Sequence, residues 1–147
     1  MRRTSHETDA CPIARSLDAI GDWWSLLIVR EAMGGRRRFG QFQKNLGMAR
    51  NILAARLRRL TELGILQTVP AADGGAHHEY ELTAKGHDLL WVLVALRQWG
   101  DRHQFPEGPG PTLLVDRAQR LPVKPLELHA ADGRLLGPGD ILLLSVD

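Results

Sequence analysis

The chain has 147 residues, of which 44% are hydrophobic, and its net charge is +2. This is enough apolar material for one domain of ordinary size with an appendage, and no apolar run approaches the roughly 18 residues of a membrane-spanning helix. A single cysteine excludes an internal disulfide, and the first residues lack the apolar stretch of a signal peptide, so we expect a cytoplasmic protein without a membrane partner.

Positive charge is concentrated between Arg30 and Leu60. This segment holds nine basic residues against one acid, Glu31, so its charge is +8 while the rest of the chain sums to −6. Such a concentration, in a segment patterned as helix, turn and helix, is typical of a protein that binds a polyanion. We expect the polyanion to be double-stranded DNA.

The chain up to residue 46 is patterned as three helices. We expect the first at Pro12–Ile20, with proline in its first turn, and the second at Trp23–Met33, apolar on nearly every side and therefore central. Two glycines end the second helix, and residues 36–39 form a short strand or turn. Residues 41–46 then supply the first helix of a helix-turn-helix.

The segment Ala49–Leu63 is predicted to be the recognition helix. Leu53, Leu57 and Leu60 fall on one stripe of a 3.6-residue helix and dock it on the core, and Gly64 follows as a C-terminal cap. The opposite face presents side chains suited to a major groove, where small residues allow close approach, asparagine can pair with adenine and arginine with guanine. These residues are Asn51, Ala54, Ala55 and Arg58. An isolated helix of this kind would more often present a solvated face, and the charge around it favours DNA.

The basic run before the helix-turn-helix has two interpretations. Alone, Arg36, Arg37 and Arg38 would be a solubilising run. Beside a DNA-proximal helix they are better suited to hold phosphates. We add Gln41 and Arg50 to the same expected DNA-binding surface.

A β-hairpin is expected directly after the recognition helix. Two short β-prone runs flank a turn that contains Asp73, Gly74 and Gly75, which makes the whole a winged helix. The tip of this wing carries no lysine or arginine. Only His77 and His78 lie on the return strand, so we expect a weak or pH-sensitive contact of the wing with DNA.

A long helix is predicted from Thr83 to Trp99. Its apolar surface is wider than one stripe and includes Leu89, Leu93, Leu96 and Trp99. Because such a helix at the edge of a small domain leaves an exposed apolar patch, we expect it to bury these residues in a homodimer. The alternative is that the C-terminal tail covers them.

The composition changes after Phe105. We expect a winged-helix domain at residues 10–103, a linker rich in proline and glycine at 104–111, and a small β-hairpin extension at 112–147. Within the extension, Thr112–Asp116, Leu126–Ala130 and Ile141–Val146 are predicted to be strands separated by turns. The fold class is therefore α+β, mainly α.

A set of spaced residues between positions 10 and 103 forms a recognisable pattern. It consists of Cys11-Pro12, Gly21-Asp-Trp-Trp24 before Leu26-Leu-Ile-Val-Arg-Glu31, Gly35 with Arg38-Phe39 and Phe42, Arg56-Leu-Arg-Arg-Leu60 with Gly64, Tyr80-Glu-Leu-Thr83 with Gly86, and Trp99. This pattern resembles the HxlR-type family of winged-helix transcriptional regulators. Two positions depart from the family pattern. Ala49 replaces the usual serine that caps the recognition helix, a loss of about 1 kcal/mol of helix stability, and Ala76 replaces a common wing proline.

The resemblance implies a homodimeric, sequence-specific DNA-binding regulator that responds to an electrophile, an oxidant or a small molecule. Cys11 stands at the start of the first helix, where the dipole favours a thiolate, and the family has a sensing cysteine at this position. It is either a redox sensor or a small residue that fills space. With no second cysteine, its oxidation could end only in an intersubunit disulfide, a mixed disulfide or an adduct.

Two other readings remain open. The chain could be a small-molecule-sensing dimer with a ligand near Trp23 and Trp24, or a winged helix that binds RNA. The six histidines are scattered, and although the extension resembles a zinc ribbon of some relatives, the cysteines of that ribbon are absent. With no catalytic set and no metal-spaced cluster, we expect neither an enzyme nor a metal or other cofactor.

Overall fold

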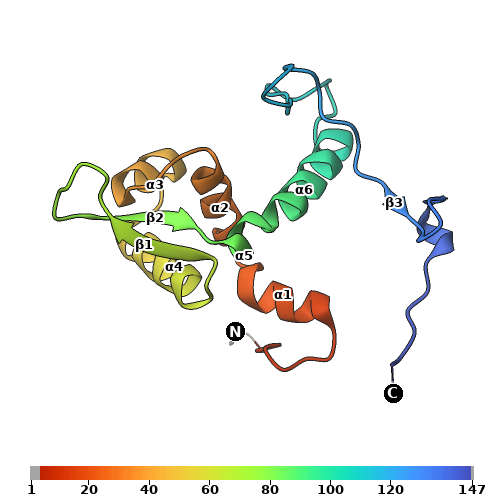
Figure 1. The fold of residues 1–147 in the computed structure, drawn as a ribbon, viewed down its shortest axis with the longest axis horizontal. Coiled ribbons are helices and arrows are strands. Elements are labelled where there is room, and N and C mark those ends of the chain that lie inside the picture. Colours follow the sequence, from red (N-terminus) through yellow and green to blue (C-terminus); the bar gives the residue numbers. More distant parts are fainter. Residues whose placement is uncertain (1–3, 147) are drawn as a thin grey trace. The chain divides into compact units, whose positions relative to one another are not determined.

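A computed structural model describes residues 4–146 (Figure 1). Its elements follow in the order α1 (Pro12–Ile20), α2 (Ser25–Met33), α3 (Phe39–Leu46), α4 (Arg50–Glu62), β1 (Leu66–Pro70), β2 (His78–Leu82), α5 (Ala84–His87), α6 (Leu89–His103), β3 (Leu128–His129), β4 (Leu135–Leu136) and the 3-10 turn η1 (Pro138–Asp140). The chain divides into two compact units, and the boundary lies inside α6, between Leu93 and Val94. Among the described residues, no helix has the length and apolar character to cross a bilayer.

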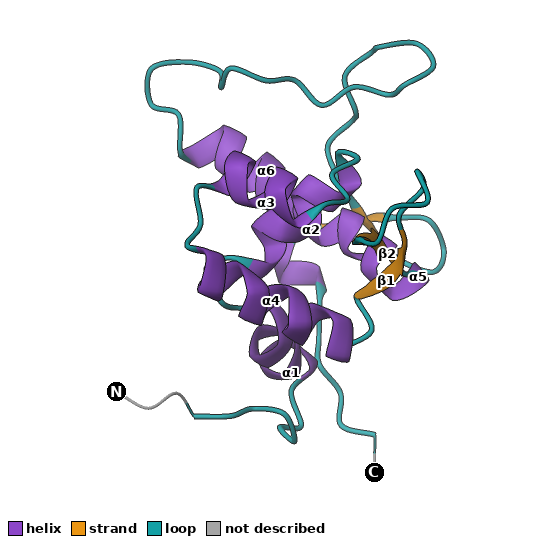
Figure 2. Cartoon of the chain, turned by 90° about the vertical axis from the view of Figure 1, so that its left-hand side faces the viewer, coloured by secondary structure: helices purple, strands orange, loops and turns teal. Residues whose placement is uncertain are grey.

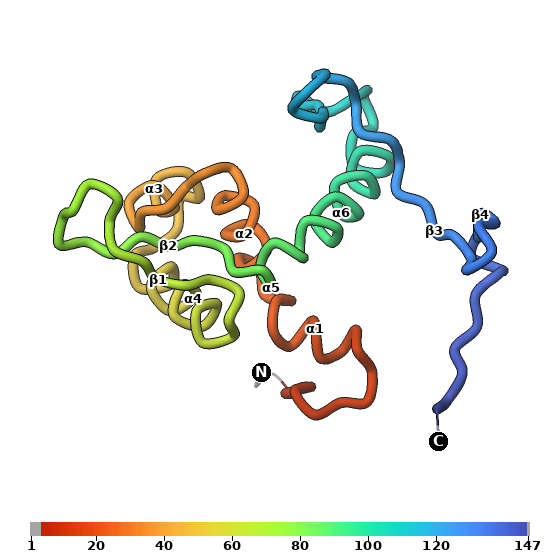
Figure 3. Tube along the Cα trace, viewed as in Figure 1, coloured from red at the N-terminus to blue at the C-terminus, as the bar shows by residue number. Residues whose placement is uncertain are grey.

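The first unit is a winged helix-turn-helix, as predicted. Helices α2, α3 and α4 gather at one end of an antiparallel hairpin of β1 and β2, and the loop of the hairpin projects from them (Figures 2 and 3). The register pairs Leu66 with Leu82 and Pro70 with His78. The chain can accept proline here because Pro70 is the last residue of its strand.

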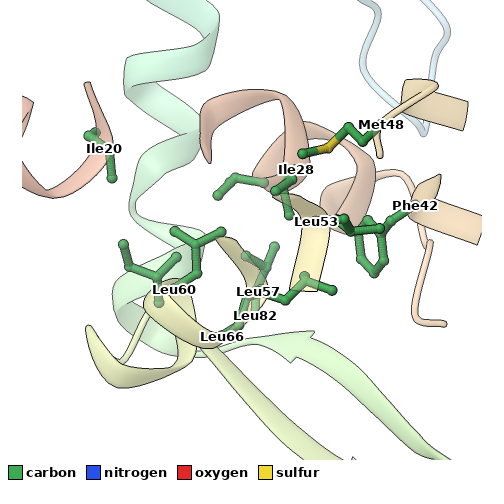
Figure 4. Close-up of a cluster of buried hydrophobic side chains, with 11 residues drawn as sticks. Ile20, Ile28, Phe42, Met48, Leu53, Leu57, Leu60, Leu66 and Leu82 are labelled. Carbon is green, nitrogen blue, oxygen red and sulfur yellow. The ribbon is translucent and has the colours of Figure 1, made fainter. Parts of the chain in front are cut away.

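The hydrophobic core lies where α2, α3, α4 and the base of the hairpin meet. The three leucines predicted to dock the recognition helix, Leu53, Leu57 and Leu60, are fully buried, together with Ile28 and Phe42 (Figure 4). Burial of a large aliphatic or aromatic side chain contributes about 1.5–3 kcal/mol. The 3.6-residue spacing of the leucines therefore fixes which face of α4 is left for solvent.

The ends of α4 agree with the sequence. Ala49 is the N-cap and its side chain makes no capping hydrogen bond, whereas Gly64 follows the helix with a φ of 73°, a left-handed conformation that favours glycine. Two other expected boundaries shift, because α2 begins at Ser25 and α3 at Phe39. Residues 36–38 form no strand, and only Arg38 lies at a bend.

The single helix predicted from Thr83 to Trp99 is divided in two. Thr83 caps α5 as expected, since its hydroxyl oxygen accepts the Gly86 N–H at 3.1 Å, but α5 ends at His87 and α6 begins at Leu89. Thr83 also donates through its backbone N–H to the carbonyl of Ile65, at 3.1 Å. These contacts hold α5 against the start of the hairpin. The sequence did not predict the break between α5 and α6, because its helical pattern continues through both.

The second unit has less regular structure than the sequence predicted. The hairpin around Asp132 and Gly133 is present, but its strands are short, with Leu128 paired to Leu136 and His129 to Leu135. Of the other two predicted strands, Thr112–Asp116 makes only one bridge, between Val115 and Pro122, and Ile141–Val146 forms none. A strand requires a partner ladder, and Pro122 has no N–H to extend one.

Candidate nucleic-acid interface

Helix α4 exposes the face that the sequence predicted. Asn51, Ala55 and Arg58 are exposed and Ala54 is half-buried, on the side opposite the docked leucines. Glu62 is also exposed, one turn beyond Arg58 on the same face, and the sequence analysis did not single it out. Its carboxylate is suited to accept a hydrogen bond from a cytosine amino group, and it would repel a phosphate.

The start of α4 is held against α3 by an aromatic contact. The guanidinium carbon of Arg50 lies 5.0 Å from the centre of the Phe39 ring, the geometry of a cation–π interaction. Because this contact engages the face of the guanidinium and no carboxylate, the charge of Arg50 is not neutralised. A hollow of about 340 Å³ opens between α4 and the hairpin, lined by Phe39, Ala54, Arg58, Thr61, Glu62, Thr68 and Tyr80.

Arg37 does not project freely toward a ligand. Its Nε donates to Oε2 of Glu79 at 2.6 Å and one of its terminal nitrogens to Oε2 of Glu81 at 3.1 Å. The hydrogen bond from Arg37 is the main reason that the pKa of Glu79 lies below its ordinary value, with the N–H of Ala72 as the next contribution. In this structure Arg37 therefore contacts the wing, and its expected phosphate contact stays a prediction.

Arg38 and Gln41, like Arg37, make hydrogen bonds within the protein. Arg38 donates to Oδ2 of Asp73 at the wing tip, at 2.6 Å, and lies 3.7 Å from Glu79. The side-chain oxygen of Gln41 accepts the backbone N–H groups of Arg37 and Arg38, at 2.9 and 3.0 Å, and so caps α3. The three residues join the wing to the first helix of the helix-turn-helix.

A second polar contact joins α2 to α4. Asp22 accepts the backbone N–H groups of Trp24 and Ser25, both at 3.0 Å, and the Ser25 hydroxyl, and it lies 3.6 Å from Arg56. Burial would raise the pKa of Asp22, but the hydrogen bonds from Ser25 and Trp24 and the charge of Arg56 lower it overall. Arg56 thus stabilises the position of α4 and is directed away from the exposed face.

These ion pairs sort the nine basic residues of the segment into two groups. Five have a carboxylate within 4 Å: Arg30 and Arg36 share Glu31, Arg37 and Arg38 pair with acids of the wing, and Arg56 pairs with Asp22. Within residues 4–146 the other four have no such partner, and three of the four lie on α4: Lys44, Arg50, Arg58 and Arg59. Most of the unpaired positive charge of this segment is therefore on the recognition helix.

A sequence profile of the HxlR-like helix-turn-helix family matches residues 19–107. The chain belongs to this family. One relative is the Mycobacterium tuberculosis protein MT3179, an uncharacterised HTH-type transcriptional regulator. It is 47% identical to this chain over 106 residues, which cover 71% of this chain and 67% of MT3179. The HxlR-like protein described here is accordingly a helix-turn-helix transcriptional regulator and not an enzyme.

Two solved structures extend the comparison. The crystal structure of PA1607, a candidate transcription factor, is 50% identical, covers 96% of this chain and 99% of its own, and has a TM-score of 0.91. The quinone-bound structure of YodB from Bacillus subtilis is 26% identical, with a TM-score of 0.54, and covers 63% of this chain and 99% of its own. The similarity to PA1607 therefore includes the C-terminal extension, whereas the similarity to YodB covers 63% of the chain.

In this HxlR-like regulator, Cys11 is the exposed N-cap of α1. Its backbone N–H donates to Oδ1 of Asp9 at 2.8 Å. Arg15, which the sequence placed near the thiol, donates through Nε to the carbonyl oxygen of Asp9. The thiol is thus open to a reagent, and it stands where α1 begins.

The remaining predicted residues fall in three places. Trp23 is 83% exposed whereas Trp24 packs against the core, so the two do not line one pocket. His78 is the first residue of β2, the return strand of the wing, His77 directly precedes it, and both side chains are exposed. Of the expected dimer residues, Leu89 and Leu93 pack against the core of their own chain, and Leu96 and Trp99 are each 51% exposed.

No metal site is formed in the part of the chain that the structure describes, since no three histidine, cysteine, aspartate or glutamate side chains come close enough together. The residues that the sequence analysis missed are Glu79 and Glu81. They stand two apart on β2, and this spacing places two carboxylates on one face of a strand. That pattern was present in the sequence, but the arginines that pair with these acids lie more than 40 residues away.

Proposed function

We propose that this regulator binds a double-stranded DNA operator as a homodimer and that α4 of each subunit enters a major groove. The observation that supports the proposal is the distribution of charge in the basic segment 30–60: after internal ion pairs are taken into account, three of its four cations without a carboxylate partner in the described structure lie on α4. A helix that combines free arginines with small side chains on one exposed face is suited to approach base edges.

Individual roles follow from position on the helix. Asn51 and Arg58 are the candidates for base contacts, with adenine and guanine respectively, and Ala54 and Ala55 allow the backbone to approach. Arg50, Arg59 and Lys44 are suited to phosphates. Arg37 and Arg38 hold the wing in place, and His77 and His78 are left as its exposed ionisable side chains near the tip.

The homodimer is proposed from exposed apolar surface. Helix α6 exposes two tryptophans, Trp91 and Trp99, and α1 exposes Ile13 and Leu17 one turn apart. Surfaces of this kind on a regulator are suited to association about a two-fold axis. The two recognition helices would then read half-sites about one helical turn apart, roughly 34 Å, or a multiple of that distance.

We also propose that an electrophile regulates DNA binding through Cys11. Two observations support it: the thiol is exposed at the first turn of α1, and the solved structure of YodB, which is similar in fold and sequence, holds a quinone. The effector would be a small electrophile of the quinone class.

Selection of bound sequences from a random pool of DNA duplexes tests the DNA-binding proposal. In a binding titration on the selected operator, we expect Arg58→Ala to cost about 1–3 kcal/mol and to relax the preference at one base pair. Arg117→Ala removes the same charge from an exposed position outside the winged helix and should bind as the wild type does. If Arg58→Ala and Arg117→Ala bind the operator equally well, α4 does not read DNA.

The salt dependence provides a second readout of the same experiment. If only the four unpaired cations of the segment 30–60 meet phosphates, a dimer makes at most about eight phosphate contacts, and the slope of log affinity against log salt should not be steeper than about −7. A slope twice as steep would require the paired arginines to leave their carboxylates on binding. No enrichment of any duplex, or preference for RNA hairpins, would contradict the proposed function itself.

A further inference from the structure

The acids of the wing and the arginines beside them form one ion-pair cluster, the wing cluster, which consists of Arg37, Arg38, Asp73, Glu79 and Glu81. Two guanidinium groups face three carboxylates, so the cluster has a net charge of −1 when histidine is counted as neutral. The hairpin, whose loop projects from the helices (Figure 3), contains no lysine or arginine between residues 66 and 82. The wing therefore offers a phosphate no net attraction, in contrast to α4.

Arg37 and Arg38 are held to different degrees. Arg37 pairs with Glu79, which is 4% exposed, and a buried carboxylate left without a partner is costly. The main partner of Arg38 is Asp73, at 2.6 Å, and the side chains of this pair are 43% and 56% exposed. The second contact of Arg38 is 3.7 Å long and is made with Glu79, which already accepts hydrogen bonds from Arg37 and from the N–H of Ala72. Because exposed ion pairs contribute little to stability, Arg38 is the arginine that can be released without loss of the fold.

We propose that Asp73 is a positioning residue that holds Arg38 away from the DNA backbone and so limits the affinity of the regulator for DNA of any sequence. The inference rests on the DNA binding of the proposed function. Asp73 is itself fixed, because its Oδ1 accepts the N–H of Gly75 at 2.9 Å. A phosphate that took Arg38 would leave this carboxylate unpaired beside a second anion, and the repulsion of like charges disfavours that exchange. While Asp73 is present, Arg38 makes no phosphate contact.

Removal of one negative charge from the wing should therefore strengthen DNA binding. Asp73→Asn keeps a side-chain oxygen that accepts the N–H of Gly75, but it no longer neutralises Arg38. One new phosphate contact per subunit makes the slope of log affinity against log salt steeper by about 1.8 for a dimer. Fluorescence anisotropy over a salt series should show the affinity for a random-sequence duplex rising at least about threefold at roughly 0.1 M salt. The gain on the selected operator should be similar, because a phosphate contact carries no sequence information.

The expected gain depends on Arg38, and a double-variant cycle tests this dependence. When Arg38→Gln is already present, Asp73→Asn should change the salt slope by less than about half of its effect in the wild type. A substitution that only loosened the wing would weaken binding in both backgrounds. Equal gains with and without Arg38 would show that Asp73 acts through its charge alone and does not act by holding this arginine, which overturns the inference.

Asp132 supplies the matched control. Its side chain is 60% exposed, its ion pair with Arg134 is 2.9 Å long, and it lies in the C-terminal extension, outside the winged helix. Asp132→Asn removes the same charge and should change the affinity for the random duplex less than about twofold. A gain equal to that of Asp73→Asn would mean that net charge sets the affinity and that the position of Arg38 does not, and the inference would be wrong.

The role of Asp73 and the proposed function fail in different ways. If the wild-type chain binds no duplex even at low salt, the DNA binding of the proposed function is wrong, and the role of Asp73 with it. If the wild type binds its operator and Asp73→Asn has the same affinity and the same salt slope, only the role of Asp73 is wrong.

Discussion

Glu79 shows how one carboxylate organises a functional surface. It is 4% exposed, accepts hydrogen bonds from Arg37 and from the N–H of Ala72, and lies within 4 Å of Arg38. A buried carboxylate is tolerated only when it is paired and hydrogen-bonded. The wing is therefore attached to α3 through a charge, and its position depends on that charge being present.

The stability of the fold should fall in acid for this reason. The pKa of Glu79 in the folded protein is lowered, first by the hydrogen bond from Arg37. The contribution of this ionised carboxylate to the stability of the fold is therefore complete above its ordinary pKa of 4.5, and it is lost as the pH falls through the lower pKa of the folded state. Asp73, whose pKa is lowered first by the N–H of Gly75 and then by Arg38, acts in the same direction. In urea titrations from pH 7 to pH 2, Glu79→Gln should be less stable than wild type at pH 7 and should lose less stability in acid.

A control variant separates the loss of the Glu79 ion pair from the general loss of stability that acid causes. Glu62→Gln removes an exposed carboxylate that has no ion pair in the described part of the chain, and its acid profile should follow that of the wild type. Equal profiles for Glu79→Gln and wild type would mean that the ion pair with Arg37 contributes nothing to stability.

At the scale of elements, local patterns predicted what local forces determine. Helix α4 follows from the spacing of Leu53, Leu57 and Leu60, and the hairpin follows from its turn, because each signal lies within one element. The Ile141–Val146 strand was wrong because β-propensity alone does not supply a partner ladder. The roles of Arg37 and Arg38 could not be predicted either, since charge counting does not show which acids the fold brings beside them.

The junction of α5 with the hairpin depends on one glycine. A Cβ on Gly86 would lie 2.2 Å from the carbonyl oxygen of Ile65, which is backbone and cannot move aside cheaply. We expect Gly86→Ala to reduce the free energy of unfolding by about 1–3 kcal/mol, as an overpacked core does. Thermal or urea unfolding measures the change.

A helical glycine elsewhere in the same unit is the matched control. Gly40, inside α3, has nothing within 4 Å of the added Cβ. Gly40→Ala should therefore raise the stability by about 0.5–1 kcal/mol, since alanine is the better helix former. If both variants lost the same stability, the close approach of α5 to Ile65 would not be the cause.

At the scale of the whole molecule, regulation requires that a change at α1 reaches α4. Cys11 begins α1, and Ile13 and Leu17 on that helix are exposed and suited to the proposed dimer interface. Both recognition helices must match one DNA register, so a shift of a few ångströms between subunits would remove several contacts at once. A modification at Cys11 need not touch DNA to change the affinity for it.

The chemical step is an addition. The Cys11 thiolate forms a carbon–sulfur bond with a ring carbon of the quinone, and the ring becomes a hydroquinone after proton transfer, so no separate oxidant is needed.

We expect benzoquinone to change the affinity for the selected operator at least several-fold in the wild type, which corresponds to a coupling of about 1–3 kcal/mol. Cys11→Ser should bind the operator equally well with and without the quinone. Fluorescence anisotropy measures the affinity, and mass spectrometry of the same samples reports the adduct. A complete adduct at Cys11 with unchanged affinity, or an equal effect in Cys11→Ser, would show that this exposed thiol is not coupled to the DNA-binding surface.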